Sequence, residues 1–526
     1  MEDDWLLEIG DVGTWQYLIW SFLVFFLVFV GLNGSSIAFL QYAPDHPWTY
    51  DRSVMTQSLV TQWDLVCDRA WHVAEIQAAF HVGIFTGGIL TGYASDRFGR
   101  RLVMVTAGVI AGLTSIAEAL TPWWQLVGVF YWLRSAALFA FHSSAFVLGS
   151  PFVTGCRLRS AVSGVIGITW ALGYLLVGGF AWLLRDWRLI LLATGAPFLL
   201  VPSAPFVIPE SPRWQLATGR LVEAAQTLQR ALRLNKGPLA IQSSSLSSKA
   251  LIGPPKTGES ESEESGVCRK ERMQFLPLLK HPKLAVRAAL IASVWACSSI
   301  MYYGTYYLVS NLPGNLYFNN AVSALAEFPG NLVLVPLLKW SRRKTMSLSL
   351  LLAALFFILL CLIPSDHWSF FALVVVGKLS TTMAFIGCWI YTGELWPTPV
   401  RTSAITFAAL CSRFGAILIP FVCLLAQSER EWERAVPFLV LGLAGLTAGG
   451  AVLLLPETAN RKLPDTLPET TSMDTFGGLR TAGDGGQFEY TFRKGDGAFS
   501  KHGSLRGGAG QRSKRFRVNA LAGQPG

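Results

Sequence analysis

Long runs of apolar residues alternate with short polar segments along most of this chain. A helix of about 20 apolar residues crosses the hydrocarbon core of a bilayer. Twelve windows meet this length, and they lie near residues 16–40, 72–93, 102–121, 124–149, 159–183, 188–208, 286–308, 317–339, 345–364, 368–391, 402–425 and 434–455. The pattern therefore predicts an all-α membrane protein with twelve transmembrane helices.

A long polar segment separates the windows into two sets of six. Residues 219–234 carry Leu and Ala at helical spacing, which predicts an amphipathic helix, and residues 237–268 are rich in Ser, Gly, Pro and Glu, which predicts disorder. We expect an N-terminal segment at 1–15, six-helix bundles at 16–208 and 286–458, a central loop at 209–285 and a disordered tail at 459–526.

Composition agrees with a membrane protein. Only 14% of the residues are charged and 52% are hydrophobic, whereas soluble domains carry nearer a quarter of charged residues. The formal charge of +10 follows from basic short turns and tails and does not require a nucleic-acid partner. With an even number of spans these basic turns and both termini share one side, which the positive-inside rule makes cytoplasmic. The eight cysteines have no CxxC spacing and predict neither a zinc site nor a disulfide framework.

The decapeptide GYASDRFGRR, residues 92–101, lies between the second and third windows. We predict that it is a short cytoplasmic turn, because its arginines follow the positive-inside rule. Two glycines let the backbone turn tightly, and Asp96 can accept hydrogen bonds from arginine side chains.

Six segments, taken in order, resemble solute carrier family 22, the organic cation and anion transporters of the major facilitator superfamily. They are Thr61–Asp68, Asp96–Arg101, Pro209–Trp214, Tyr302–Gly304, Thr392–Arg401 and Leu455–Thr458. The resemblance implies two six-helix bundles, a central cavity and alternating access. It also implies an inward gate of acid–base networks, which we expect to involve Asp96, Arg97, Gly99, Arg100, Arg101, Glu210, Arg213, Glu394 and Arg401.

The chain departs from the family pattern at three places. The first outward loop has about thirty residues and one cysteine, where the family has a large cysteine-rich loop. Pro151 stands where the family has glutamate after the fourth helix, and the turn at Lys339–Lys344 lacks the acid and the glycine. These departures leave open a second hypothesis, in which the protein is a receptor or scaffold that does not transport.

Several ionisable residues fall inside the apolar windows, where a charge is costly and normally faces a cavity or a partner. Arg134, Lys378 and Arg413 are basic, and Glu327 is acidic. If they share a cavity, it is net positive and attracts anions. The alternative is that Glu327 pairs with Arg134 or Lys378 and joins two helices, and for Arg134 we favour such a structural role.

Arg413 stands where the organic-cation members of the family have aspartate, whereas anion members and the carnitine branch have arginine. Glu327 resembles the cation branch, so the two signals conflict. Aromatic walls hold flat organic ions through apolar and cation–π contacts. The candidate substrate-binding residues are Arg413, Lys378, Tyr302, Tyr303, Tyr306, Glu327, Trp389, Phe141 and Trp170.

These patterns predict a secondary-active or facilitative transporter of organic ions, with anions favoured over cations or carnitine. We expect it in the plasma membrane. The sequence carries no Walker loop, nucleophile elbow or metal-binding spacing, so we expect no enzyme activity and no cofactor. The expected partners are a small organic ion and membrane lipid, with no nucleic acid, and a protein partner of the tail stays open.

Overall fold

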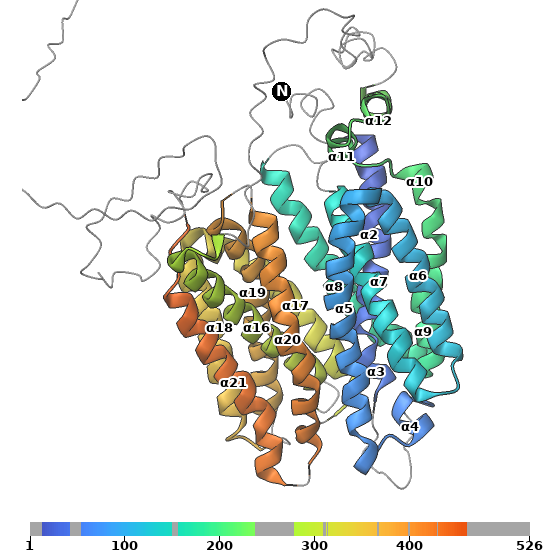
Figure 1. The fold of residues 1–526 in the computed structure, drawn as a ribbon. Coiled ribbons are helices and arrows are strands. Elements are labelled where there is room, and N and C mark those ends of the chain that lie inside the picture. The colour runs from blue at the N-terminus through green and yellow to red at the C-terminus, as the bar shows by residue number, and fades with distance from the viewer. Residues whose placement is uncertain are drawn as a thin grey trace, which may run out of the picture. The chain divides into compact units, whose positions relative to one another are not determined.

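The described part of the chain is built from helices (Figure 1). The computed structural model describes residues 13–42, 54–149, 156–236, 278–308, 312, 314–364, 368–397, 400–428 and 430–459. All of them lie in one unit of the chain, Met1–Gly478. Within these ranges the only strand-like pairing is an isolated bridge between Gln57 and Asp186.

Six membrane-length segments form the first half, coloured blue to green in Figure 1. They are α2 (Thr14–Ser35) continued by α3 (Ile37–Leu40), α5 (Trp71–Phe98), α6 (Arg100–Leu120), α7 (Trp124–Gly149), α8 (Cys156–Leu184), and α9 (Trp187–Gly195) continued by the 3₁₀ helix η3 (Ala196–Ser203) and α10 (Ala204–Val207). The short helices α4 (Leu59–Trp63) and η1 (Cys67–Arg69) precede α5.

Six more form the second half, coloured yellow-green to red. They are α16 (Pro282–Leu308), α17 (Leu316–Trp340), α18 (Arg342–Leu360), α19 (Trp368–Leu395), α20 (Arg401–Cys423) continued by η5 (Leu424–Gln427), and α21 (Glu431–Leu453). The described residues thus contain twelve helices long and apolar enough to cross a membrane, which confirms the prediction of two six-helix bundles.

The predicted turn lies within the decapeptide at residues 92–101, but it is shorter than expected, because most of the decapeptide is helical. Helix α5 continues to Phe98 and α6 begins at Arg100, so only Gly99 lies between them. Gly99 has φ +96°, in the region that favours glycine. Asp96 and Arg97 therefore stand on the last turn of α5, and the whole reversal of direction takes place at one residue.

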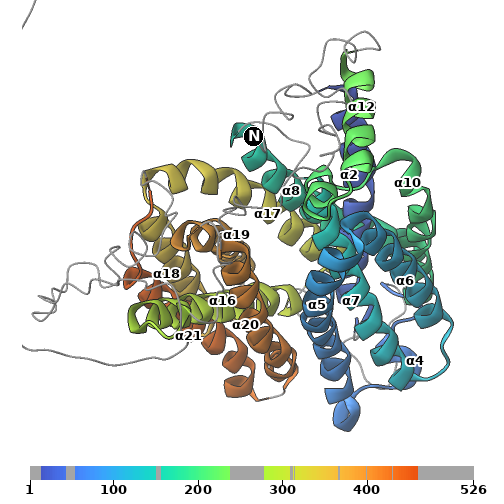
Figure 2. The same ribbon diagram turned by 45° about the horizontal axis from the view of Figure 1, so that its top comes forward.

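Small residues bring helices of the first half close together. A Cβ added to Gly173 of α8 would lie 2.5 Å from the backbone nitrogen of Leu32, and one added to Gly31 of α2 would lie 2.9 Å from the carbonyl oxygen of Trp170. Glycine at such crossings lets helix backbones approach in a membrane. Between the halves, α5 packs against α20 and α8 packs against α17 (Figures 1 and 2).

A buried polar network joins four helices of the first half. Arg134 of α7 donates from Nε to Glu118 Oε2 of α6 at 2.7 Å and from Nη2 to Glu118 Oε1 at 3.2 Å. Its Nη1 donates to the backbone and side-chain oxygens of Asn33 on α2. Asn33 in turn donates to Thr194 of α9 at 3.2 Å. Because Arg134, Glu118 and Asn33 are fully buried, this network fixes how the helices pack.

The amphipathic helix predicted at 219–234 is confirmed as α12 (Leu221–Lys236), which follows the short α11 (Pro212–Ala217). Its buried face consists of Ala224, Ala225, Leu228, Ala231 and Leu232. Near its end, Asn235 accepts a hydrogen bond from the backbone N–H of Trp15 at 3.0 Å and donates to Gln16 at 2.8 Å. The side chain of Asn235 thereby binds the first turn of α2.

Candidate functional site

Four tyrosines on the last two turns of α16 form the centre of the candidate site. Tyr302, Tyr303, Tyr306 and Tyr307 line a cavity of about 10 Å³ with Trp170 of α8, Phe80 of α5, and Gly34 and Ile37 of the first membrane segment. The lining therefore comes from both halves of the chain. A space of this size holds about one water molecule, so in this conformation the site is closed around its own side chains.

Lys378 of α19 and Glu327 of α17 form a buried ion pair beside this cavity. Lys378 Nζ lies 3.1 Å from Glu327 Oε1, and both side chains are almost wholly inaccessible to solvent. Tyr302 donates its hydroxyl hydrogen to the same carboxylate at 2.9 Å. The ammonium also lies 4.0 Å from the centre of the Tyr302 ring. The two charges cancel, so this pair adds no net charge to the site.

Arg413 of α20 is buried against Tyr303. Its Nη1 donates to the Tyr303 hydroxyl at 3.1 Å, its Nε donates to the Ala409 carbonyl at 3.4 Å, and its guanidinium carbon lies 5.5 Å from the centre of the Tyr303 ring. Among the residues that the structure describes, no carboxylate forms an ion pair with Arg413. The guanidinium thus gives this region a positive charge that its neighbours do not cancel.

His81 of α5 belongs to the same cluster, and sequence reasoning missed it. Its Nε2 lies 2.8 Å from the Tyr307 hydroxyl, across the boundary between the two halves. The imidazole also packs edge-on against the ring of Tyr303, with centroids 4.4 Å apart. The available signal was a histidine well inside the second apolar window, nine residues after His72 at its start.

Side-chain hydrogen bonds also join α8 to the second half. Trp170 donates to the Tyr302 hydroxyl at 3.2 Å, and Tyr174 donates to the Ser323 hydroxyl at 3.2 Å. Tyr306 donates to the backbone carbonyl of Ser35. Trp170 and Tyr306 were both predicted at the site, and the structure brings them together with Tyr302 and Tyr303.

The structure places two other predicted residues elsewhere. Phe141 is fully buried in the core of the first half, between Phe26 and Phe198, with ring centroids 6.0 and 5.5 Å away. Trp389 packs edge-on against Trp295 at 4.8 Å and is partly exposed. Neither lines the tyrosine cavity, because each side chain has its own aromatic partner.

The expectation of three bases facing one acid was also wrong. Arg134 pairs with Glu118, an acid within the third window that sequence reasoning overlooked, and not with Glu327. Of the alternatives, the pairing of Lys378 with Glu327 is the one observed. The structural role favoured for Arg134 agrees with its burial in the network of the first half.

Glu210 binds the start of α6. Its carboxylate accepts hydrogen bonds from the backbone N–H groups of Arg100 and Arg101, each at 3.0 Å. A negative group at a helix N-terminus is favourable because the free N–H groups carry partial positive charge. A Cβ on Gly99 would lie 2.6 Å from Glu210 Oε2, so glycine also makes room for this carboxylate.

The other predicted gating residues of the first half have local partners. Asp96 pairs with Arg100 at 3.3 Å, and its carbonyl accepts from the indole of Trp214 at 3.0 Å. Arg97 donates to Tyr93 at 2.8 Å on its own helix. Arg213 lies on α11, and its side chain falls outside the described atoms, as does Pro151 altogether. These interactions stay within the first half.

The second half repeats the arrangement with different residues. Glu457 accepts from the backbone N–H groups of Arg342 at 2.9 Å and Arg343 at 3.3 Å at the start of α18, and from the hydroxyl of Ser341. Sequence reasoning missed this role of Glu457. The signal was the Pro-Glu pair that follows the sixth helix of each half, Pro209-Glu210 and Pro456-Glu457.

Glu394 of α19 pairs with Arg342 of α18. The side chains meet at 3.1 Å, and Thr458 donates to the same carboxylate at 2.6 Å. Arg401 is the first residue of α20. The aliphatic part of its side chain lies near Gly393, where an added Cβ would be 3.9 Å from Arg401 Cδ. In this conformation the Arg342–Glu394 pair lies inside the second half, so it does not itself join the two bundles.

Glu457, which caps the N-terminus of α18, should make the stability of the protein depend on pH. Partial burial raises the pKa of this carboxyl, but hydrogen bonds from Ser341 and from the N–H groups of Ala459, Arg342 and Arg343 lower it more, and the net pKa lies below the ordinary value of 4.5. A lowered folded-state pKa stabilises the fold above the unfolded-state pKa, and this stabilisation is lost as the pH falls through the folded-state value.

We expect Glu457→Gln to lower the unfolding free energy by about 1 kcal/mol at neutral pH. The difference from the wild type should shrink as the pH falls below 4.5. Thermal unfolding of detergent-solubilised protein from neutral pH downwards measures both effects. Glu223→Gln, in the exposed pair with Arg220, is the matched control and should change little. A difference that grows on acidification would contradict the assigned cap.

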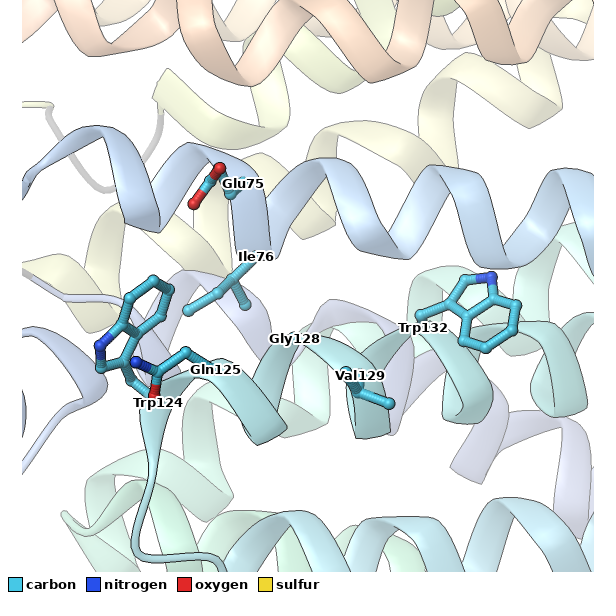
Figure 3. Close-up of a pocket in the computed structure, with 7 residues that line it drawn as sticks. All are labelled: Glu75, Ile76, Trp124, Gln125, Gly128, Val129 and Trp132. Carbon is cyan, nitrogen blue, oxygen red and sulfur yellow. The ribbon is translucent and has the colours of Figure 1, made fainter.

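A larger groove lies between α5 and α7, away from these charges (Figure 3). It has a volume of about 340 Å³ and is lined by Glu75, Ile76, Trp124, Gln125, Gly128, Val129 and Trp132. Its lining includes one carboxylate and no basic side chain. The groove therefore offers no positive charge to an anion, and the candidate site remains the tyrosine cluster.

Comparisons with known proteins agree with the fold. The profile described as "Sugar (and other) transporter" matches residues 30–466. Mouse solute carrier family 22 member 21 is 30% identical over 426 residues, which cover 80% of this chain and 73% of that protein. The human organic cation/carnitine transporter 2 is 30% identical over the same shares of both chains. Bovine solute carrier family 22 member 1 is 30% identical over 85% of this chain and 76% of that protein.

A solved structure shares the fold. The xylose transporter XylE of E. coli, in a partially occluded inward-open conformation, matches with a TM-score of 0.62 at 15% identity and covers 86% of this chain and all of that one. With twelve membrane-length helices and relatives over four fifths of its length, the chain belongs to the sugar (and other) transporter family and, within it, to solute carrier family 22.

Proposed function

We propose that this protein carries organic anions across the plasma membrane, as a secondary-active or facilitative transporter that works by alternating access. Its family membership supports transport of a small organic solute. The preference for anions rests on the charges at the tyrosine cluster, the orientation rests on the basic turns between helices, and the plasma-membrane location rests on the resemblance to solute carrier family 22.

Arg413 is the observation that carries the proposal. Lys378 is compensated by Glu327 at 3.1 Å, whereas Arg413 has a tyrosine hydroxyl and a backbone carbonyl as partners. Each oxygen accepts a hydrogen from the guanidinium but neither brings a full negative charge. An anionic substrate that reaches Arg413 supplies that charge, and in a water-poor site the attraction is stronger than in water.

The tyrosines supply the apolar part of the site. Tyr302, Tyr303, Tyr306 and Tyr307 surround the space next to Arg413 with aromatic carbon. A substrate with a carboxylate or sulfonate at one end and an aromatic or aliphatic body at the other fits both features. We therefore assign the substrate class as amphipathic organic monoanions.

Transport of cations or of carnitine is the second candidate. It is favoured by the human relative whose name is organic cation/carnitine transporter 2 and by tyrosine faces that attract ammonium groups. A zwitterion would place its carboxylate at Arg413 and its ammonium on a ring face. Lys378 already lies 4.0 Å above the Tyr302 ring, and for this reason we rank the cation and zwitterion substrates below anions.

Substrate entry requires the two bundles to separate, because the closed cavity of about 10 Å³ admits no organic ion. The bonds between the halves that must open include those between His81 and Tyr307, from Trp170 to Tyr302, from Tyr174 to Ser323 and from Tyr306 to Ser35. In the proposed cycle the bundles rock about the site, and none of the described residues in the range 209–285 lines the tyrosine cavity.

Uptake of labelled solutes by cells that express the chain tests the proposal. The panel contains aromatic monocarboxylates, quaternary ammonium ions and carnitine, with surface biotinylation to measure the protein at the plasma membrane. We expect saturable uptake of the monocarboxylates alone. Cells that express an unrelated membrane protein at the same level provide the background.

Two other outcomes of the uptake experiment would contradict the proposal. Saturable uptake of quaternary ammonium ions or carnitine keeps the carrier and overturns its preference for anions. Absence of any uptake, with surface protein confirmed, overturns the carrier and favours the receptor or scaffold hypothesis.

A further inference from the structure

The ammonium of Lys378 is surrounded by aromatic rings from both halves of the chain. Its Nζ lies 4.0 Å from the ring centre of Tyr302, 5.8 Å from that of Tyr174 and 6.0 Å from that of Tyr306. Tyr174 belongs to α8 of the first half, and the other two belong to α16 of the second half. Ring faces within about 6 Å attract a cation through the quadrupole of the aromatic system.

One carboxylate completes this surrounding. Glu327 Oε1 lies 3.1 Å from Nζ, and the Tyr302 hydroxyl holds the carboxylate at 2.9 Å. Trp170 donates to the Tyr302 oxygen at 3.2 Å and so orients the ring. Three ring faces and one fixed carboxylate are the features that recognise an organic ammonium ion. None of them requires an N–H group on the cation, so a quaternary ammonium would be attracted as well.

We propose that Lys378 is a tethered replacement for a substrate cation. Its side chain fills an ammonium-binding site formed by Tyr174, Tyr302, Tyr306 and Glu327, and thereby closes that site to free organic cations. Removing the side chain opens the site to small alkylammonium ions. This inference rests on the proposed function, because it explains why a protein with an ammonium-binding group of rings and a carboxylate selects anions.

The atoms that Lys378→Ala removes define the probe. They are Cγ, Cδ, Cε and Nζ, which together have the size and charge of n-propylammonium. In the variant, the buried carboxylate of Glu327 has lost the ammonium that compensated its charge, and this destabilises the protein. A ligand that binds only the folded state raises its stability by an amount that grows with the logarithm of the ligand concentration above its Kd, so n-propylammonium should restore part of what the substitution removes.

The experiment measures thermal unfolding of the purified full-length protein in detergent. We expect Lys378→Ala to unfold several degrees below the wild type, and n-propylammonium to raise its unfolding temperature with the logarithm of its concentration once this exceeds the Kd. The wild type, whose site is filled, should not respond. Propan-1-ol, which has nearly the same shape without the charge, should stabilise neither protein.

The double variant Lys378→Ala/Glu327→Gln is the matched control. It has the same space and rings but no carboxylate, so n-propylammonium should leave its unfolding temperature unchanged. If the single variant responds no more than the double variant, or responds equally to propan-1-ol, the proposal is wrong. If Lys378→Ala gives no folded protein, the yield of folded protein is measured instead of the unfolding temperature, with and without n-propylammonium in the growth medium and buffers. An unchanged yield overturns the proposal.

This binding measurement does not depend on transport. Suppose that n-propylammonium stabilises Lys378→Ala but the wild type takes up no anion. This result would keep the ammonium site and overturn the carrier. Anion uptake by the wild type, together with no effect of n-propylammonium on the variant, would keep the carrier and overturn the ammonium site.

Discussion

Cells that express Arg413→Asp are expected to lose saturable uptake of organic monoanions while they retain normal amounts of the protein at the surface. Arg413 is buried, and its partners are the Tyr303 hydroxyl and the Ala409 carbonyl. The substitution replaces an attraction for the substrate with a repulsion. Two charges 4 Å apart interact by about 4 kcal/mol at the effective dielectric constant of a partly buried site, so loss of the attraction alone corresponds to a roughly thousandfold change in affinity, and the repulsion adds to it.

Two further variants separate charge from geometry. Arg413→Lys keeps the positive charge but loses the planar guanidinium that meets Tyr303, and it should retain uptake with a raised KM. Arg430→Asp reverses an exposed charge in the pair with Glu433 and should transport as the wild type does. Undiminished anion uptake by Arg413→Asp would show that substrate does not bind at Arg413.

The second large effect is expected at the buried network of the first half. Arg134→Met removes the partner of Glu118, with which Arg134 forms two hydrogen bonds at 2.7 and 3.2 Å, and leaves the oxygen atoms of Asn33 without their donor. Breaking one side of a buried pair costs about 3–5 kcal/mol, because the remaining charge stays buried without compensation. Chemical denaturation of the detergent-solubilised protein measures this loss.

A double-mutant cycle distinguishes the pair from simple packing. Arg134→Met/Glu118→Leu removes both charges, and we expect it to be more stable than Arg134→Met alone. Arg430→Met, which breaks an exposed pair, should change the unfolding free energy by less than about 1 kcal/mol. If Arg134→Met costs no more than that, the network does not hold the four helices together.

The sequence predicts helices of this protein well, because each must cross the same apolar layer. Twelve windows predicted twelve spans, and the polar pattern of residues 219–234 predicted α12. The ends are less well predicted, since they depend on single residues. Gly99 reverses the chain at one position, and the last span of the first half changes to 3₁₀ geometry over Ala196–Ser203, where Pro202 has no N–H to donate.

Pairing partners could not be read from the sequence. The apolar windows place Glu327 and Lys378 inside the membrane. Whether Glu327 pairs with Lys378 or with Arg134 depends on how α17, α19 and α7 are arranged. Arg134 finds Glu118 because α6 and α7 are neighbours, and Glu327 finds Lys378 because α17 and α19 are neighbours. The same applies to His81, whose partner Tyr307 lies in the other half of the chain.

The closed tyrosine cavity has a consequence for the electrical behaviour of a membrane that contains this protein. Protons and hydrated ions cross a protein along continuous chains of water, and a space of about 10 Å³ holds roughly one molecule. The hydrogen bonds from Tyr306 to Ser35 and from His81 to Tyr307 bring residues of opposite halves into contact around it. In this conformation the tyrosine cluster interrupts such a chain, so we expect no leak current along this route through the substrate-free protein.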